Sequence, residues 1–404
     1  MKKTLIILFL FSTSFSSESY LSFYGSGERL SNLNPSSISL GWSNLFDANN
    51  YLNTANLSNV YLSDLVRLSM GADFNFNFIG NNKYYSNKMT YFNFLLPIHK
   101  NKKALGFSLS PLYRINSTVI ESEYNYYTDS DTTLAYKSKY NFEGGPSVFS
   151  VIFSSELTKN ISLGIKADYI FGSLYSYKEH STYDIQENFN VDDGWSQDYI
   201  LSSTDLYTTI SNYNGYGLEL EGSFHNLKNR LSMSINLMNQ IQIDEYFYDD
   251  IVPEALELGY DYNQKIEYNL PSPMEINIGF SRKLNNKNTL IAEYYIYKPY
   301  EDDAGFNILN NPDVDKNRFS IGYYRPLMNN NLVLSTGLYQ IDSNSDEMES
   351  NKQGITLGLG VNIKSISADF CLEIGRNKVT IDEVFDEKYV NLYMGLTSSD
   401  KWFK

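Results

Sequence analysis

The chain has 404 residues, with 32 Lys and Arg against 47 Asp and Glu, so its formal net charge at pH 7 is −15. A nucleic-acid-binding protein usually carries an excess of basic residues, and this chain is acidic, so we expect no nucleic-acid partner. The single cysteine, Cys371, excludes a disulfide framework and a thiolate metal cage. No internal stretch of about 20 apolar residues is present to span a bilayer as a helix, which excludes a helical membrane protein.

The chain begins with MKKTLIILFLFSTSFSSES, a pattern that predicts export. Lys2 and Lys3 precede an apolar run over residues 5–11, and a serine-rich segment follows. The apolar run is too short for a membrane span but is typical of a secretory signal peptide. We therefore expect residues 1–18 to be removed, with cleavage near residues 16–19.

Residues 19–65 are rich in Asn, Ser and Gly and show no long apolar/polar alternation. Scattered apolar side chains, such as Leu40, Trp42, Leu45 and Phe46, argue against full disorder. The segment is either a periplasmic leader or a plug, and the choice depends on the fold of the chain that follows it.

Residues 66–80, VRLSMGADFNFNFIG, alternate without a break. The even positions, from Val66 to Phe78, are apolar, and the odd positions, from Arg67 to Asn77, are polar or small. Period-2 alternation predicts a β-strand, but strands of soluble domains usually last about five or six residues. A longer strand with phenylalanine on one side and amide or charge on the other predicts contact with two different solvents.

The same alternation recurs along the chain and predicts about fourteen strands. Their approximate limits are residues 66–80, 84–97, 103–122, 138–157, 161–177, 206–225, 229–243, 268–284, 287–298, 316–326, 330–341, 352–363, 366–376 and 388–398.

The connections between these strands fall into two alternating classes. Six are short and often basic: HKNKK, TKN, HNLKN, LNNKN, LMNNN and KSIS. The others, such as residues 177–205 and 244–265, are longer and mostly acidic. Short turns at one end and long loops at the other are typical of outer-membrane barrels, whereas the blades of a soluble propeller lack this alternation. We therefore predict an all-β protein, a transmembrane antiparallel β-barrel of about 14 strands over residues 66–404.

In such a barrel the apolar faces meet lipid, the polar faces meet the lumen, and an even strand number places both chain ends on the periplasmic side. Residues 19–65 are then expected to form an N-terminal hatch, a plug inside the lumen. Outer-membrane lipid is the expected surrounding of the barrel, and the cell outer membrane of a Gram-negative bacterium is its expected location.

Three stretches carry a resemblance to a known family: SISLGWSNLFDANNYLNTANLSN, EGGPSVFSVIFSSELTKNISLGIKADYIFGS and LTSSDKWFK. The first resembles the N-terminal hatch of FadL-type outer-membrane transporters and of their relatives, the PorV/PorQ-like barrels of type IX secretion. The second resembles the central hairpin of the family, and the third resembles the C-terminal ending common in the PorV-like branch. The resemblance implies a fourteen-stranded barrel with a hatch.

The family carries an Asn-Pro-Ala motif just before its first strand, and the matching positions here are Asn53, Thr54 and Ala55. Thr54 replaces the proline, so the rigid kink that a proline would supply is missing. Asn53, Thr54, Ala55 and Asn56 are accordingly the predicted binding-site residues, as elements of the hatch.

Neither catalysis nor metal binding is predicted. The histidines, His99, His180 and His225, lie far apart in sequence and have no His or Cys at ligand spacing, and no G-x-S-x-G motif occurs. We expect His99 in a short turn, His180 in a long loop and His225 at a strand end. The acidic runs EDD at 301–303 and VDD at 191–193 lack the spaced ligands and the glycine of a calcium loop. We predict no enzyme activity, no metal and no cofactor.

Two functions stay open. The resemblance to FadL implies passive transport of hydrophobic compounds, with fatty acids as the family default, whereas the PorV-like resemblance implies an accessory or shuttle barrel that binds a secreted protein. Expected inward acidic residues outnumber the basic ones, which disfavours an anionic ligand and favours a neutral hydrophobic one. The acidic set is Asp73, Glu156, Asp168, Glu219, Glu221, Glu275, Glu293, Asp369 and Glu373, and the basic set is Arg67, Arg114, Lys166 and Arg318.

We favour transport and keep the accessory barrel as the alternative. If transport is right, a lateral gap or an apolar pocket should sit beside the hatch. If shuttling is right, the barrel should be sealed and a partner surface should lie on its loops or rim.

Overall fold

The computed structural model describes residues 28–29, 33–48, 56–79, 82–123, 133–190, 194–238, 241–249, 264–270, 274–284, 288–298, 315–344, 349–380 and 384–401. Among these residues, no helix is long and apolar enough to cross a membrane.

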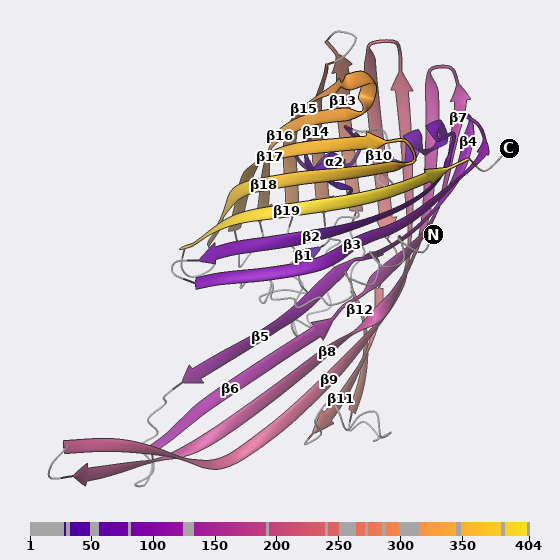
Figure 1. Ribbon diagram of the computed structural model, residues 1–404. Helices are drawn as coiled ribbons and strands as arrows, with labels where there is room; N and C mark the ends of the chain where they lie inside the picture. Colours follow the sequence, from indigo (N-terminus) through magenta and orange to yellow (C-terminus); the bar gives the residue numbers. More distant parts are fainter. Residues whose placement is uncertain are drawn as a thin grey trace.

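The protein is an antiparallel β-barrel of fourteen strands, as the sequence predicted (Figure 1). The last strand, β19, pairs with the first strand of the barrel, β2, from Asp400 opposite Val66 to Glu387 opposite Ile79, and this pairing closes the cylinder. Closure removes the free sheet edges that a bilayer does not tolerate.

Ten of the fourteen strands are continuous: β2 (Val66–Ile79), β3 (Asn82–His99), β8 (Ile161–Asn190), β9 (Gly194–His225), β14 (Thr289–Lys298), β15 (Asp315–Leu327), β16 (Leu332–Asn344), β17 (Glu349–Ile363), β18 (Ile366–Thr380) and β19 (Val384–Asp400). The other four are each described in two pieces: β4 and β5 (Lys103–Pro111, Tyr113–Glu123), β6 and β7 (Thr133–Gly144, Ser147–Thr158), β10 and β11 (Asn229–Met238, Ile241–Asp249), and β12 and β13 (Gln264–Leu270, Met274–Lys283). The first two pairs are interrupted at Leu112 and at Gly145–Pro146, whereas residues 239–240 and 271–273 lie outside the described residues.

The six short connections lie where the sequence placed them. They join His99 to Lys103, Thr158 to Ile161, His225 to Asn229, Lys283 to Thr289, Leu327 to Leu332 and Ile363 to Ile366. The barrel also begins and ends at this end, because Val66 and Asp400 are paired there. His99 lies at one of these turns and His225 ends β9, as expected.

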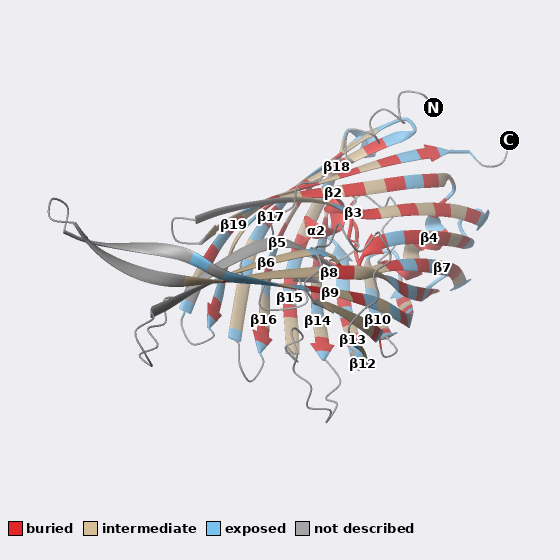
Figure 2. Cartoon of the chain, turned by 90° about the horizontal axis from the view of Figure 1, so that it is seen from below, coloured by how far each residue is buried: buried red, intermediate tan, exposed pale blue. Residues whose placement is uncertain are grey.

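Burial alternates along the strands as the sequence predicted (Figure 2). On β2, Leu68 and Phe76 are each 38 % exposed on the outer surface, whereas Ser69 and Asp73 are 2 % and 4 % exposed and face the lumen. An apolar outside and a polar inside form the surface that a barrel needs in lipid.

The interruptions at Leu112 and at Gly145–Pro146 lie next to Gly172 of β8 and form one line across these neighbouring strands, which we call the bend line. Gly144, Gly145 and Gly172 have φ of 109°, 122° and 126°, in the region that only glycine occupies readily. They are adjacent in space, because the Gly145 N–H donates to the Ser173 carbonyl and the Leu112 N–H donates to the Pro146 carbonyl. Beyond it, β5, β6 and the outer halves of β8 and β9 run away from β2 and β3 (Figure 1).

Strands β8 and β9 correct the sequence interpretation. They contain 30 and 32 residues, about three times the 9–11 residues that cross a bilayer. Residues 177–205 therefore form most of a long hairpin and not a loop, and His180 lies within β8. The sequence of residues 177–205 mixes polar and aromatic residues without strict apolar/polar alternation, so the pattern did not reveal the hairpin.

The N-terminal segment contributes three short elements: β1 (Glu28–Arg29), helix α2 (Pro35–Ile38) and the 3₁₀ helix η2 (Leu57–Leu62). A second 3₁₀ turn, η4 (Met328–Asn330), lies in a short connection. Buried residues of α2 and η2 pack against the inner faces of strands from opposite sides of the barrel, β17 and β18 for α2 and β7 and β8 for η2.

Candidate functional site

The candidate site is the hatch, meaning residues 33–48 and 56–65, together with the lumen wall around it. One apolar cluster joins Leu40, Leu45, Phe46 and Ala48 of the hatch to Ile291 and Val333 of the wall. A second joins Leu57 and Val60 to Leu95, Ala104 and Ile152, and a third joins Leu33 and Ile38 to Cys371 and Tyr393. The wall therefore turns apolar side chains inward where the hatch packs.

Glycines of the wall let the hatch backbone approach closely. A Cβ on Gly322 would lie 2.7 Å from the Leu40 carbonyl oxygen, and a Cβ on Gly337 would overlap the backbone of Gly41. A Cβ on Gly358 would likewise overlap Ser39, and a Cβ on Gly164 would overlap Leu57. The hatch is thus seated directly on the strands, with no space for a side chain between them.

Glu293 of β14 holds the first half of the hatch. This carboxylate is 2 % exposed, and it accepts hydrogen bonds from the Ser43 hydroxyl at 2.6 Å, from the Asn44 N–H at 2.9 Å and from the Leu45 N–H at 3.1 Å. The Arg318 guanidinium lies 3.0 Å away and balances the charge. Charge-assisted bonds of this kind are stronger than neutral ones.

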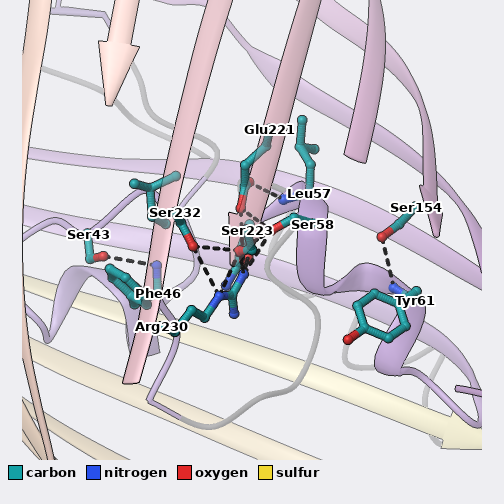
Figure 3. A network of polar contacts seen from close by, with 12 residues as sticks. Ser43, Phe46, Leu57, Ser58, Tyr61, Ser154, Glu221, Ser223, Arg230 and Ser232 are labelled. Carbon is teal, nitrogen blue, oxygen red and sulfur yellow. Dashed lines mark hydrogen bonds and ion pairs between the residues drawn. The ribbon is translucent and has the colours of Figure 1, made fainter. Parts of the chain in front are cut away.

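Glu221 of β9 holds the second half of the hatch, residues 56–65 (Figure 3). It is fully buried and accepts from the Leu57 N–H at 2.6 Å and the Ser58 hydroxyl at 2.5 Å. Its counter-charge is Arg230 of β10, 3.7 Å away. Arg230 also donates to the Ser58 hydroxyl at 2.8 Å and to the Asn56 side-chain oxygen at 3.1 Å.

A third buried carboxylate, Glu373 of β18, holds Trp42. It accepts from the Trp42 indole N–H at 2.9 Å, from the Tyr393 hydroxyl at 2.5 Å and from the Tyr339 hydroxyl. The Trp42 backbone has φ of 66°, and this uncommon conformation turns its ring toward Tyr339 and Tyr393. Three acidic residues from different strands therefore secure the hatch at separate points.

Of the four predicted site residues, the structure describes only Asn56. Asn53, Thr54 and Ala55 lie outside the described residues, so their role stays a prediction. Asn56 is 2 % exposed and immediately precedes η2, where its side-chain oxygen accepts the hydrogen bond from Arg230. The sequence analysis missed Arg230, because it stands beside a short turn and was not assigned to the inner face.

The inward acidic residues are largely as predicted. Asp73, Asp168, Glu219, Glu275 and Asp369 are each at most 9 % exposed, as are Glu221, Glu293 and Glu373. Glu156 is only partly buried, and the side chain of Arg114 lies outside the described residues. Lys166 sits between Glu219 at 2.6 Å and Asp168 at 3.4 Å. Because Glu221, Glu293 and Glu373 bind the hatch, much of the acidic excess in the lumen is structural.

The strand pairing of the barrel wall is interrupted between β3 and β5 among the described residues. β3 pairs with β4 only from His99 opposite Lys103 to Phe92 opposite Leu109. Before Phe92, β2 is the only strand that pairs with β3 among the described residues, while β5 turns away with β6. We call this interruption of the strand pairing the lateral gap, and it begins at the bend line, where β4 ends and β5 starts on either side of Leu112.

An apolar cluster lines the bend line where the gap begins. It consists of Leu112, Val148, Ile170 and Ile241, with Tyr213 packed against it. Ile170 faces inward on β8 two residues beyond Asp168, so the cluster lies directly above the charged wall of the lumen. Along β8, the inward face thus changes from the charged Asp168 to the apolar Ile170 at the bend line.

Nothing in the described chain forms a metal site. No group of three or more His, Cys, Asp or Glu residues with metal-binding geometry occurs in the described ranges. The acidic runs at 191–193 and 301–303 lie outside those ranges. Cys371 is buried under the hatch as a free thiol.

The fold is that of FadL-type outer-membrane channels. The chain aligns over 93 % of its length with the whole of a Pseudomonas aeruginosa FadL homologue, with a TM-score of 0.56 and 11 % identity. The CymD monoaromatic hydrocarbon channel aligns with a TM-score of 0.53 and 11 % identity, covering 91 % of this chain and 97 % of CymD. The P. putida toluene transporter TodX gives 0.50 and 11 %, over 94 % and 99 % of the two chains.

Sequence comparison gives the family. The sequence model of BamG matches residues 1–404, so the chain belongs to the BamG family. No curated protein matches the chain by sequence.

Proposed function

We propose that this protein is a passive channel that carries small neutral hydrophobic compounds across the outer membrane. The observation that carries the proposal is the lateral gap between β3 and β5, which opens beside the apolar cluster of Leu112, Val148, Ile170 and Ile241. An apolar solute at that cluster has a short path through the wall into the bilayer, where its transfer from water is favourable.

Because the hatch is held firmly in the lumen, we expect a solute to leave sideways through the barrel wall. A solute that moved straight down the lumen would have to displace a segment held by Glu221, Glu293 and Glu373 and seated on wall glycines. Breaking one buried charged contact costs about 3–5 kcal/mol. Exit above the hatch requires none of these contacts to break.

The pairing of charges in the lumen favours a neutral solute over an anionic one. Lys166 is already paired with Glu219 and Asp168, and Arg318 with Glu293, so these cations are not available to hold a carboxylate. Two of the structural neighbours, CymD and TodX, are described as hydrocarbon or toluene proteins, which fits a neutral aromatic solute better than a fatty acid.

Uptake of radiolabelled toluene by cells that carry the protein in the outer membrane tests the proposal. Val148→Gln places an amide in the apolar cluster, and we expect it to lower the uptake rate several-fold. The matched control is Val379→Gln, which makes the same change at another buried valine outside this cluster and should leave uptake near that of the unaltered protein. Equal uptake by both variants and by cells without the protein would refute transport through this site.

A second candidate is the accessory barrel that binds a secreted protein. The β8–β9 hairpin favours it, because strands of 30 and 32 residues project a broad sheet beyond the membrane. Removal of the hairpin tip, residues 181–204, should then abolish co-purification of the secreted protein while toluene uptake stays normal. Loss of uptake without loss of a bound protein would exclude this role.

A further inference from the structure

Exposed lysines gather at the end of the barrel that carries the short connections. We call the six connections at this end the lysine rim, and they join His99 to Lys103, Thr158 to Ile161, His225 to Asn229, Lys283 to Thr289, Leu327 to Leu332 and Ile363 to Ile366. All but one of them contain lysine and none contains Asp or Glu, although acidic residues outnumber Lys and Arg by 47 to 32 in the whole chain. Positive charge is therefore concentrated at one end of an acidic protein.

The lysines of the rim are exposed and largely without acidic partners. In the described residues they are Lys100, Lys102, Lys103, Lys159, Lys228, Lys283 and Lys364. Lys100 lies 3.9 Å from Asp64, and the others form no ion pair within the described part of the chain. A row of like charges that the protein itself does not balance attracts an anionic surface.

Each connection of the rim also exposes a large apolar side chain in or next to its turn. The six residues are Ile98, Leu157, Leu227, Leu284, Met328 and Ile363. Leu227 is 93 % exposed at the tip of its turn. Exposed apolar side chains that gather at one place mark a contact surface, and apolar residues beside lysines are the composition of a surface that lies in a membrane interface.

The rim runs around the barrel and is not confined to one side. Its connections join β3 to β4, β7 to β8, β9 to β10, β13 to β14, β15 to β16 and β17 to β18, so one of them occurs at every second strand of the closed cylinder. Where β19 closes on β2, Lys401 is exposed directly after Asp400. A protein partner would cover one side of the barrel, whereas lipid headgroups surround it at one height, so the ring favours lipid.

We propose that the lysine rim lies in the headgroup layer of the periplasmic leaflet and binds anionic phospholipids there through their phosphate groups. The ammonium groups pair with the phosphates, and the exposed apolar side chains of the connections contact the adjoining part of the acyl chains. This contact sets the height of the barrel in the bilayer from its short-turn end. It is independent of the proposed transport function.

The lipid preference of the full-length protein in vesicles tests the proposal. The variant Lys159→Gln/Lys228→Gln/Lys283→Gln removes one lysine from each of three rim connections. The matched control, Lys137→Gln/Lys378→Gln/Lys388→Gln, removes three exposed lysines from the halves of β6, β18 and β19 that lie away from the rim. Electron spin resonance compares the association of spin-labelled phosphatidylglycerol and phosphatidylcholine with each protein.

The unaltered protein should prefer phosphatidylglycerol about two-fold or more at low salt. The rim variant should lose about half of the excess, the control variant should keep it, and 1 M NaCl, with a Debye length of about 3 Å, should abolish it. Equal association of the two lipids with the unaltered protein, or the same loss in both variants, would overturn the proposal. No lipid preference together with an amine crosslink from Lys228 to an acidic protein would identify a protein occupant and would also overturn it.

Fluorescent labelling measures the position of the rim. Leu227→Cys, labelled with bimane in vesicles, should be quenched several-fold more strongly by lipids brominated near the headgroup than Leu201→Cys. Leu201 is the matched control because it is also an exposed leucine but lies in the outer half of β9. Cys371 is fully buried and should not react. Equal quenching at the two positions would place the rim outside the headgroup layer and reject the proposal.

Discussion

Glu221, Glu293 and Glu373 show how a lumen carboxylate becomes part of the fold. Each stands at an inward position of a strand, where the sequence placed it, and each accepts hydrogen bonds from the hatch. The sequence analysis interpreted their charge as a property of the solute path. Their partners, such as the Leu45 and Leu57 N–H groups, come from more than 160 residues away, so a one-dimensional pattern could not pair them.

Glu293→Ala should release the first half of the hatch. The substitution leaves the Arg318 charge and two hatch N–H groups without their acceptor, at a cost of about 3–5 kcal/mol. We expect proteolytic cleavage within residues 39–48 of the folded protein, detected by mass spectrometry. Glu293→Gln keeps one acceptor oxygen and should be cleaved more slowly, and equal resistance of the alanine variant and the unaltered protein would contradict this role.

Gly337→Ala should displace the hatch by steric overlap and not by loss of a hydrogen-bond acceptor. The new Cβ would overlap the backbone of Gly41, and packing strain of this kind costs about 1–3 kcal/mol. Gly222→Ala is the matched control, because a Cβ there would meet no atom within 4 Å. Protease sensitivity of the hatch should rise for Gly337→Ala only, and a similar rise in both variants would point to a general effect of losing glycine.

At the scale of the strand, periodicity identified the membrane-spanning segments well. It worked because β2, β16, β17 and similar strands have lipid on one face and the lumen on the other. It failed in the outer halves of β8 and β9, whose 30 and 32 residues exceed the length that a bilayer requires, so apolar/polar alternation is not needed along the whole strand. The glycines of the bend line were visible in the sequence, but only their adjacency in space shows that they bend several strands together.

Gly172→Ala should weaken the bend. At φ of 126° a side chain is strained, and we expect a loss of about 1–2 kcal/mol in the free energy of unfolding in detergent. Gly222→Ala again serves as the control for the loss of a glycine. Unchanged stability of Gly172→Ala would mean that the strand reaches the same curvature without a positive φ.

Leu220→Arg tests which face of β9 meets lipid. Leu220 is 44 % exposed on the outer surface, five residues from the end of β9. Arginine near the bilayer centre should destabilise the barrel by about 2–4 kcal/mol, measured by reversible unfolding in lipid vesicles. Leu227→Arg is the control, because Leu227 lies in the short turn after β9 and is 93 % exposed. Equal effects at both positions would place Leu220 outside the membrane.

At the scale of the whole molecule, the described strands carry exposed apolar side chains on the outer surface, and the hatch packs against their inner faces. The protein should therefore require detergent for purification and should migrate faster on unboiled than on boiled SDS gels, because the closed sheet unfolds only on heating. Freely soluble protein without detergent would contradict the membrane barrel. The hatch is part of this unit, since its clusters join strands from opposite sides of the barrel.

The sequence by itself determined the barrel, the number of its strands, the faces of most inward charges and the end that carries the short turns, because each depends on neighbours one or two residues apart along a strand. Only the tertiary structure decided the lateral gap, the apolar cluster beside it and the way the hatch is held. These features arise where β3 parts from β5 and where hatch residues meet strands far along the chain. Contacts at such separations are set by how the whole sheet curves and closes, which no local pattern records.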